Sequence, residues 1–128
     1  LPGACPESIT VAATDSGDQI VSFSTRGPVY WKNLKLNKPD VAAPGYNIES
    51  ADTGGGYKTR SGTSMSVPHV AGALAMIHQG VPTASVLDLK KALLSGAHDV
   101  EDKGYDYDSG YGRISIFKSL QILSLEFQ

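Results

Sequence analysis

The sequence has few of the features that fix a structure covalently or give it extreme charge. It contains one cysteine, Cys5, among 128 residues, so no disulfide can form within the chain. Charged residues make up only 19% of the chain, and the formal net charge of −2 gives no reason to expect nucleic acid as a partner. No apolar run approaches the roughly 18 residues that a membrane-spanning helix needs, so no membrane partner is expected. The hydrophobic content of 41% is typical of one globular domain.

Short apolar segments precede longer helical patterns, which predicts an α/β fold. The run before Pro44 and Gly45 is continuously apolar, as expected for a buried parallel strand. Two β-like runs flank three glycines, which supply the positive φ angles of a tight hairpin turn. The predicted strands are 9–13, 20–23, 41–43, 48–51 and 57–61. Residues 31–37 show no clean period and are predicted to form a surface loop.

The strongest local signal is a helix that follows Ser64. Its apolar residues recur at i, i+3, i+4 and i+7 and predict one buried stripe, made of Val67, Val70, Ala71, Leu74 and Ile77. Thr63 is expected to cap this helix, and Gly80 to end it. A second helix is predicted from about 83 or 85 to 95, with Val86, Leu89 and Leu93 buried and Gly96 as its stop. A third is predicted from about 115 to 124.

Residues 62–72 read Gly-Thr-Ser-Met-Ser-Val-Pro-His-Val-Ala-Gly. The serine of this segment, Ser64, lies where a helix begins, and backbone N–H groups there lack intrahelical acceptors. The positive end of the helix dipole also favours negative charge at that point. Such surroundings suit a serine that attacks a carbonyl carbon, because an oxyanion forms beside it. The segment resembles the nucleophile motif G-T-S-M-[AS]-x-P-H-V-A-G of the subtilisin-like serine proteases (subtilases, peptidase family S8).

Four further segments resemble the same family, in the family's order. They are I-T-V-A-A-T-D at 9–15, F-S-T-R-G-P at 23–28, K-P-D-V-A-A-P-G at 38–45 and G-Y-G-R-I at 110–114. The resemblance covers nearly all of residues 4–124. It implies a three-layer α/β subtilisin-like fold with a mostly parallel sheet, represented here by its C-terminal half. In subtilases the catalytic aspartate, the catalytic histidine and the oxyanion-hole asparagine lie upstream of the matched segments. Residues 1–128 are therefore expected to be the C-terminal portion of one catalytic domain.

The resemblance implies a role for each residue near the motif. Ser64 would be the nucleophile, although a lone serine at a helix start is more often a cap. Gly62, Thr63 and Met65 would lie beside the oxyanion. Arg60 and Ser61 would flank the leaving-group side of the scissile bond. The alternative for Arg60, an exposed basic residue at a hairpin end, is equally open.

The resemblance assigns structural roles to His69 and Pro68. His69 follows Ser64 by five residues, about 500° around a helix, so direct proton transfer between the two side chains is not expected. In the family this histidine packs beneath the site. Pro68 is expected in the first turn or so, where a missing N–H is tolerated. His69, His78, His98 and Cys5 show no zinc-type spacing.

Calcium is the one ion that the sequence suggests, and the chemistry itself requires no cofactor. The acidic segment 99–108 offers carboxylates from Asp102, Asp106 and Asp108, and many subtilases bind calcium. Its spacing does not fit an EF-hand, and a solvated loop is the alternative. Asp40 is a further candidate, with a structural carboxylate at a strand start as the alternative.

Two classes of function remain open at this point. The resemblance implies a secreted serine endopeptidase that acts on polypeptides, with this chain supplying the nucleophile. The alternative is a non-catalytic pseudoprotease or an assembly or binding fragment, although the intact Gly62-Thr63-Ser64 core argues against it. The upstream half of the same domain is the expected partner. Without it the chain is expected to hydrolyse no peptide and to associate with itself.

Overall fold

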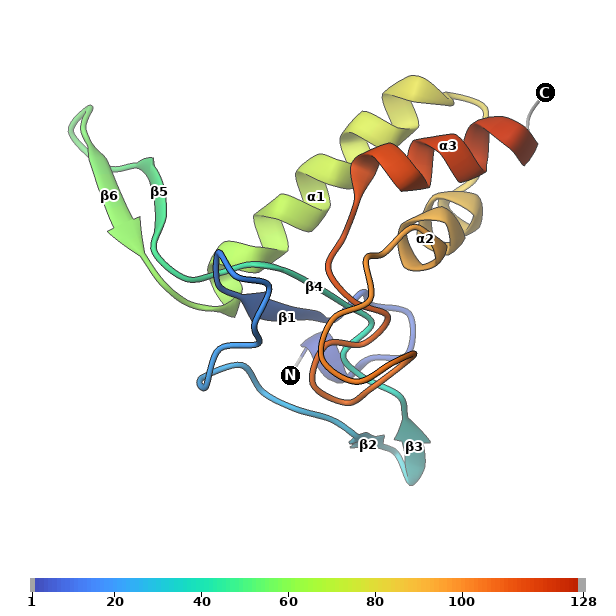
Figure 1. The fold of residues 1–128 in the computed structure, drawn as a ribbon, viewed down its shortest axis with the longest axis horizontal. Helices are drawn as coiled ribbons and strands as arrows, with labels where there is room; N and C mark the ends of the chain where they lie inside the picture. The colour runs from blue at the N-terminus through green and yellow to red at the C-terminus, as the bar shows by residue number, and fades with distance from the viewer. Residues whose placement is uncertain (1, 127–128) are drawn as a thin grey trace.

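Two parallel strands, β1 (Val11–Thr14) and β4 (Val41–Pro44), lie at the centre of the computed structural model, which describes residues 2–126 (Figure 1). Their register pairs Val11 with Val41, and a parallel bridge from Ala42 to Arg113 extends the sheet beyond β4. The strands predicted at 9–13 and 41–43 are confirmed. All four residues of β1 are buried. Parallel strands are commonly covered on both faces and are then apolar on both.

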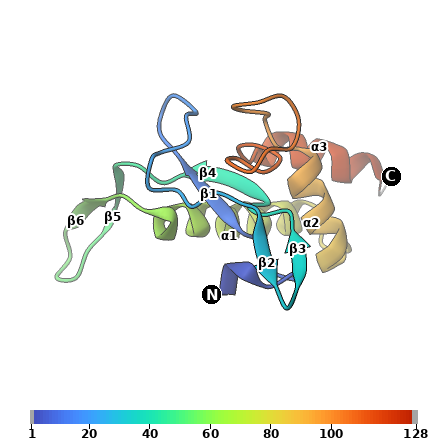
Figure 2. The same ribbon diagram turned by 90° about the horizontal axis from the view of Figure 1, so that it is seen from below.

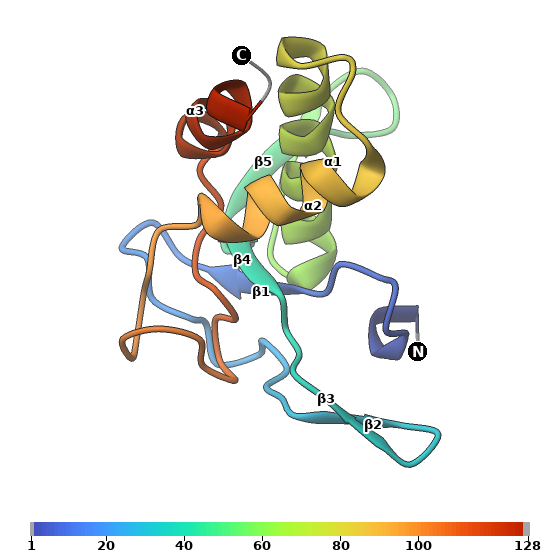
Figure 3. The same ribbon diagram turned by 90° about the vertical axis from the view of Figure 1, so that its right-hand side faces the viewer.

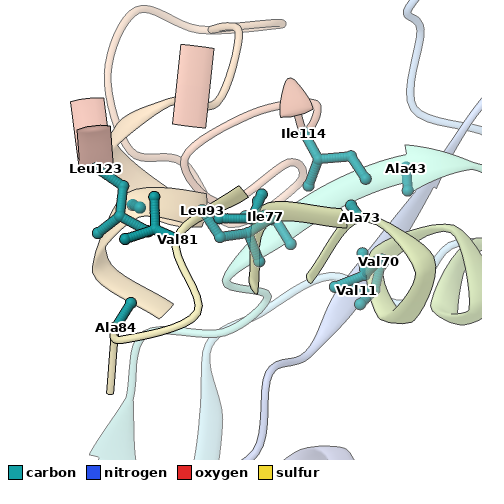
Figure 4. Packing of buried hydrophobic residues seen from close by; sticks show 12 residues of the cluster. Val11, Ala43, Val70, Ala73, Ile77, Val81, Ala84, Leu93, Ile114 and Leu123 are labelled. Atoms are coloured by element: carbon teal, nitrogen blue, oxygen red, sulfur yellow. The ribbon is translucent and has the colours of Figure 1, made fainter. Parts of the chain in front are cut away.

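One helix covers a face of this sheet, and two more pack against that helix. The long helix α1 (Thr63–Gly80) packs on β1 and β4, and α3 (Ile116–Glu126) packs against both α1 and α2 (Val86–Ser95) (Figure 2). The core lies between α1 and the sheet and continues between the helices (Figure 4). Its buried members are Val11, Val41, Ala43, Val70, Ala73, Ile77, Val81, Ala84, Ala92, Leu93, Ile114 and Leu123. The predicted α/β class is confirmed by this arrangement.

The buried stripe of α1 differs from the predicted one. Ser66, Val70, Ala73 and Ile77 face the core, while Val67 is 50% exposed. Ala71, also predicted to be buried, is exposed as well. The prediction was wrong here because several small apolar residues make two helix faces look alike in sequence. The buried face carries a serine, which an apolar pattern passes over.

Two antiparallel hairpins project from this body. The hairpin of β5 (Ile48–Ala51) and β6 (Tyr57–Arg60) is confirmed, and it leads directly into α1. A second hairpin, β2 (Val29–Trp31) with β3 (Leu34–Leu36), occupies the predicted loop (Figure 3). Lys32 and Asn33 have φ angles of 46° and 66°, the positive values that a two-residue hairpin turn requires. The loop prediction missed this turn because neither residue is glycine.

The strand predicted at 20–23 does not form. Only Ile20 makes a bridge, to Thr14 of β1. The segment instead supplies partners to Ala13: Val21 N–H donates to its carbonyl at 3.0 Å, and Ser24 Oγ accepts from its N–H at 3.0 Å. These contacts close part of the outer edge of β1.

The two shorter helices begin and end close to their predicted positions. Ser85 caps α2 through a capping box with Asp88, and Gly96 follows its last turn. Hydrogen bonds from the backbone N–H and hydroxyl of Ser85 lower the pKa of Asp88. Val86, predicted to be buried, is 85% exposed because it is the first residue after the cap and points to solvent. None of the helices within residues 2–126 is long and apolar enough to cross a membrane.

The isolated 128-residue chain is expected to associate with itself in solution. Large apolar side chains stay exposed on the helices, including Val67 and Met76 on α1 and Phe117 on α3. Helix packing is the expected route, since residues 20–24 already cover part of the β1 edge. Light scattering at micromolar concentration should show a dimer or larger species. A monomer at every concentration would contradict this expectation.

Candidate active site

Ser64 is the second residue of α1 and its side chain is exposed. The chain enters the helix from β6 through Gly62, whose φ of 154° is unfavourable for other residues. Gly62 also replaces Thr63 as the residue before the helix, and no side chain caps the N-terminus. The predicted cap at Thr63 is therefore wrong. Because no side chain occupies the helix N-terminus, its backbone N–H groups, that of Ser64 among them, keep the capacity to bind an anion.

Gly45 fixes the start of α1 to the end of β4. Gly62 N–H donates to the Gly45 carbonyl at 2.8 Å. A Cβ atom on Gly45 would collide with the hydroxyl of Ser66 and would lie 2.9 Å from the Gly62 carbonyl and 2.7 Å from Ala13 Cβ. Only glycine allows this close approach, so Gly45 determines how closely the start of α1, and with it Ser64, lies to the sheet.

Gly45→Ala is expected to destabilise the protein by about 1–3 kcal/mol, because the clash forces the end of β4 away from α1. It should also displace Ser64, because Ser64 moves with Gly62. Thermal unfolding measures the first effect, and the rate at which a fluorophosphonate labels Ser64 in the full-length protein measures the second.

Gly72→Ala is the matched control. An added Cβ at Gly72 meets nothing within 4 Å in the described part of the chain. The control should be neutral or stabilise the helix by up to about 1 kcal/mol. Equal behaviour of the two variants would refute the role given to Gly45.

Ser64 lies between two hollows. The first, of about 370 Å³, is bounded by the β5–β6 hairpin and the first turns of α1. Its lining residues are Ile48, Ser50, Ala51, Asp52, Thr53, Lys58, Arg60, Ser64, Met65 and Pro68. The second, of about 330 Å³, joins Ser64 and Thr63 to the residues before and within β1. An extended polypeptide passing over Ser64 would therefore meet a depression on each side.

The two residues before Gly62 make different contacts. Arg60 faces the first hollow together with Ser64. Ser61 instead accepts a hydrogen bond from Asn47 N–H through its hydroxyl, at 2.9 Å. This bond holds the base of the hairpin against the loop after β4. Met65 is half-buried and lines the first hollow beside Ser64.

His69 is exposed, and its Nδ1 atom lies 2.8 Å from the carbonyl oxygen of Met65 on its own helix. No residue among 2–126 covers it, so the packing beneath the site that the resemblance implies is not provided by this part of the chain. None of His69, His78 and His98 forms a hydrogen bond with Ser64 within residues 2–126. Pro68 lies in the second turn of α1 rather than the first. Its missing N–H leaves the Ser64 carbonyl without its usual helical donor.

Asp40 is held by a buried lysine. Lys38 Nζ lies 2.7 Å from Asp40 Oδ2, with the two side chains 4% and 12% exposed. The same carboxylate accepts the N–H of Thr10 at 2.7 Å, and Lys38 Nζ donates to the Ser8 carbonyl at 2.6 Å. A carboxylate already paired with an ammonium group is a poor cation ligand. At Asp40 the structure therefore favours the structural carboxylate over a calcium ligand.

The acidic segment does not gather its carboxylates. Asp106 accepts the N–H groups of Asp108 and Ser109 and the hydroxyl of Ser109, so it organises its own turn. Asp108 pairs with Arg26 at 2.9 Å, and Asp102 is exposed. Within residues 2–126 no group of three acidic, histidine or cysteine side chains is placed to hold a metal ion. The structure thus favours the solvated loop over a calcium site.

Comparison with known proteins identifies the family of the chain. The sequence profile of the subtilase family matches residues 1–112. The chain belongs to the subtilase family. It is 38% identical over 119 residues to the minor extracellular protease Vpr of Bacillus subtilis, and this alignment covers 85% of the chain and 14% of Vpr. It is 36% identical over 120 residues to a subtilisin of Bacillus pumilus, covering 94% of the chain and 39% of the relative.

A plant relative shows the same relationship. The subtilisin-like protease SBT6.1 of Arabidopsis thaliana is 34% identical over 131 aligned residues, covering 95% of the chain and 12% of that protein. The chain thus spans from 12% to 39% of the length of these three relatives. All three carry names of proteases, so the family resemblance read from the sequence is confirmed.

Proposed function

We propose that this chain is the C-terminal part of a subtilase catalytic domain and that Ser64 is the nucleophile of a serine endopeptidase. The observation that carries the proposal is the position of Ser64: exposed, at an uncapped helix N-terminus, between two hollows, in a chain of this family. A serine that served only as a helix cap would bond to its own helix, and no side-chain cap is present at α1.

The chemistry is acyl transfer. Ser64 Oγ attacks the peptide carbonyl while a histidine outside this chain takes its proton. The tetrahedral oxyanion is stabilised by the Ser64 N–H, by the positive end of α1 and by an asparagine outside this chain. The histidine then protonates the leaving amine as the peptide bond breaks. Water then attacks the acyl carbonyl while the same histidine takes its proton, and the histidine returns that proton to Ser64 Oγ as the ester bond breaks.

Neighbouring residues support this reaction without taking part in bond changes. Gly62 and Gly45 set the position of the helix start, and Thr63 and Met65 form the walls on either side of Ser64. Arg60 borders the leaving-group side. The reaction requires no metal ion. Two relatives, Vpr and Epr of Bacillus subtilis, are named extracellular proteases, and we extend that location to the protein that carries this chain.

A fluorophosphonate probe tests the proposal directly. The full-length protein that carries this chain should be labelled, and the label should lie on Ser64 within the tryptic peptide 61–90. The isolated 128-residue chain should neither react at a comparable rate nor hydrolyse peptides, because the general base is absent from it. A well-folded full-length protein that takes no label would favour the non-catalytic alternative.

A further inference from the structure

One face of the β5–β6 hairpin carries two positive charges toward Ser64. Lys58 and Arg60 are two residues apart on β6, so their side chains point to the same face. The register places them opposite Ser50 and Ile48, and all four residues line the same hollow as Ser64. A substrate side chain that enters this hollow therefore meets a lysine and an arginine next to the reacting serine.

A single carboxylate in the hollow opposes these two cations, and only weakly. Asp52 Oδ1 lies 3.8 Å from Arg60 Nη2, and the two side chains are 34% and 58% exposed. An exposed ion pair at that distance contributes at most about 1 kcal/mol, so Arg60 can exchange Asp52 for another partner. Lys58 forms no ion pair with any residue of the described part of the chain.

The other acid of the hairpin, Glu49, lines a different hollow. Glu49 lies in a neighbouring hollow with Pro68 and His69, not in the one that Lys58 lines. The hollow beside Ser64 therefore has two cations, one carboxylate and an excess of positive charge. Apart from Asp52 and the two cations, its polar lining side chains are limited to the neutral hydroxyls of Ser50, Thr53 and Ser64.

We infer that this hollow selects an acidic residue, aspartate or glutamate, at one position next to the scissile bond of a polypeptide substrate. Arg60 binds the incoming carboxylate and Lys58 adds to its attraction, with Asp52 displaced from Arg60. Charge-assisted bonds between a guanidinium and a carboxylate are stronger and more directional than neutral ones. The inference rests on the proposed function and names the substrate class of the same site.

The test uses the full-length protein and quenched peptides that differ at one position. Glutamate, glutamine and lysine are placed in turn at each of two positions on either side of the cleaved bond. At one of these positions kcat/KM should be about three to ten times higher for glutamate than for glutamine, and lowest for lysine. The ratio should fall toward 1 in 1 M salt, where the screening length is only about 3 Å.

Variants assign the preference to the hairpin. Arg60→Gln should reduce the glutamate-to-glutamine ratio, Arg60→Gln with Lys58→Gln should bring it to about 1, and Arg60→Glu should favour lysine. Lys91→Gln removes the same charge from α2, which lies at the opposite end of the molecule from the hairpin in Figure 1, and should leave the ratio unchanged.

The failure of this inference differs from that of the proposed function. Hydrolysis of all peptides with equal glutamate and glutamine rates at every position would overturn the inference alone. So would a glutamate preference that survives the double substitution. If the unmodified full-length protein showed neither hydrolysis nor fluorophosphonate labelling, both the inference and the proposed function would be overturned.

Discussion

Ser64→Ala in the full-length protein is expected to abolish peptide hydrolysis, lowering kcat by about six orders of magnitude. Losses of that size accompany removal of the nucleophile from a serine-protease triad, as in subtilisin itself. Labelling by fluorophosphonate should disappear as well. Because Ser64 is exposed and forms no cap, the free energy of unfolding should change by less than about 0.5 kcal/mol in thermal unfolding experiments.

His69→Ala is the informative comparison, because His69 is the histidine closest to Ser64 in the sequence. Its Nδ1 atom contacts the Met65 carbonyl and not Ser64. In the full-length protein, where the resemblance implies that the rest of the domain packs over His69, we expect this variant to keep its reactive serine and to lose mainly stability. A His69 variant with native thermal stability and a selective loss of kcat would show that the structural role is wrong.

The parts of the site that could be predicted from sequence are those with a local pattern. The Gly-Thr-Ser segment, the helix after it and the glycine-rich hairpin before it each carry their own signal, and all three form where predicted. Together they place Ser64 and Arg60 beside one hollow. This placement depends only on the register of the hairpin and on the first turn of α1, which are both local in sequence.

The features that could not be predicted depend on contacts between distant segments. Gly45 matters because Ser66 and Gly62, some 20 residues later, pack against it. Asp40 is a calcium candidate in the sequence because some subtilases bind a cation near the segment that it resembles. Its carboxylate is nevertheless held by Lys38, two residues away, and by Thr10, 30 residues earlier. The Lys-Pro-Asp segment places the two charged residues of that ion pair close together in sequence. The burial of both charges is visible only in the folded chain.

The Lys38–Asp40 pair leads to the second prediction with a large effect. Lys38→Met in the full-length protein is expected to destabilise it by about 3–5 kcal/mol, because it leaves the Asp40 carboxylate buried without its counter-ion. The change also removes the bond from Lys38 to the Ser8 carbonyl and so loosens the segment that leads into β1. Denaturant unfolding, followed at the transition that involves this domain, measures the loss.

Combining Lys38→Met with Asp40→Asn separates the buried charge from the lost contacts. Asparagine keeps an oxygen that accepts the Thr10 N–H, and it carries no charge. The double variant should therefore be more stable than Lys38→Met alone. With Asp40→Asn completing the cycle, the coupling energy should be about 1–3 kcal/mol. If Asp40 instead served as a calcium ligand, added calcium would restore Lys38→Met toward wild-type stability, since the ion would replace the missing ammonium. We expect no such recovery. Within residues 2–126 no acidic neighbour is placed to share a metal ion with Asp40, and a single carboxylate cannot compensate for the cost of dehydrating calcium.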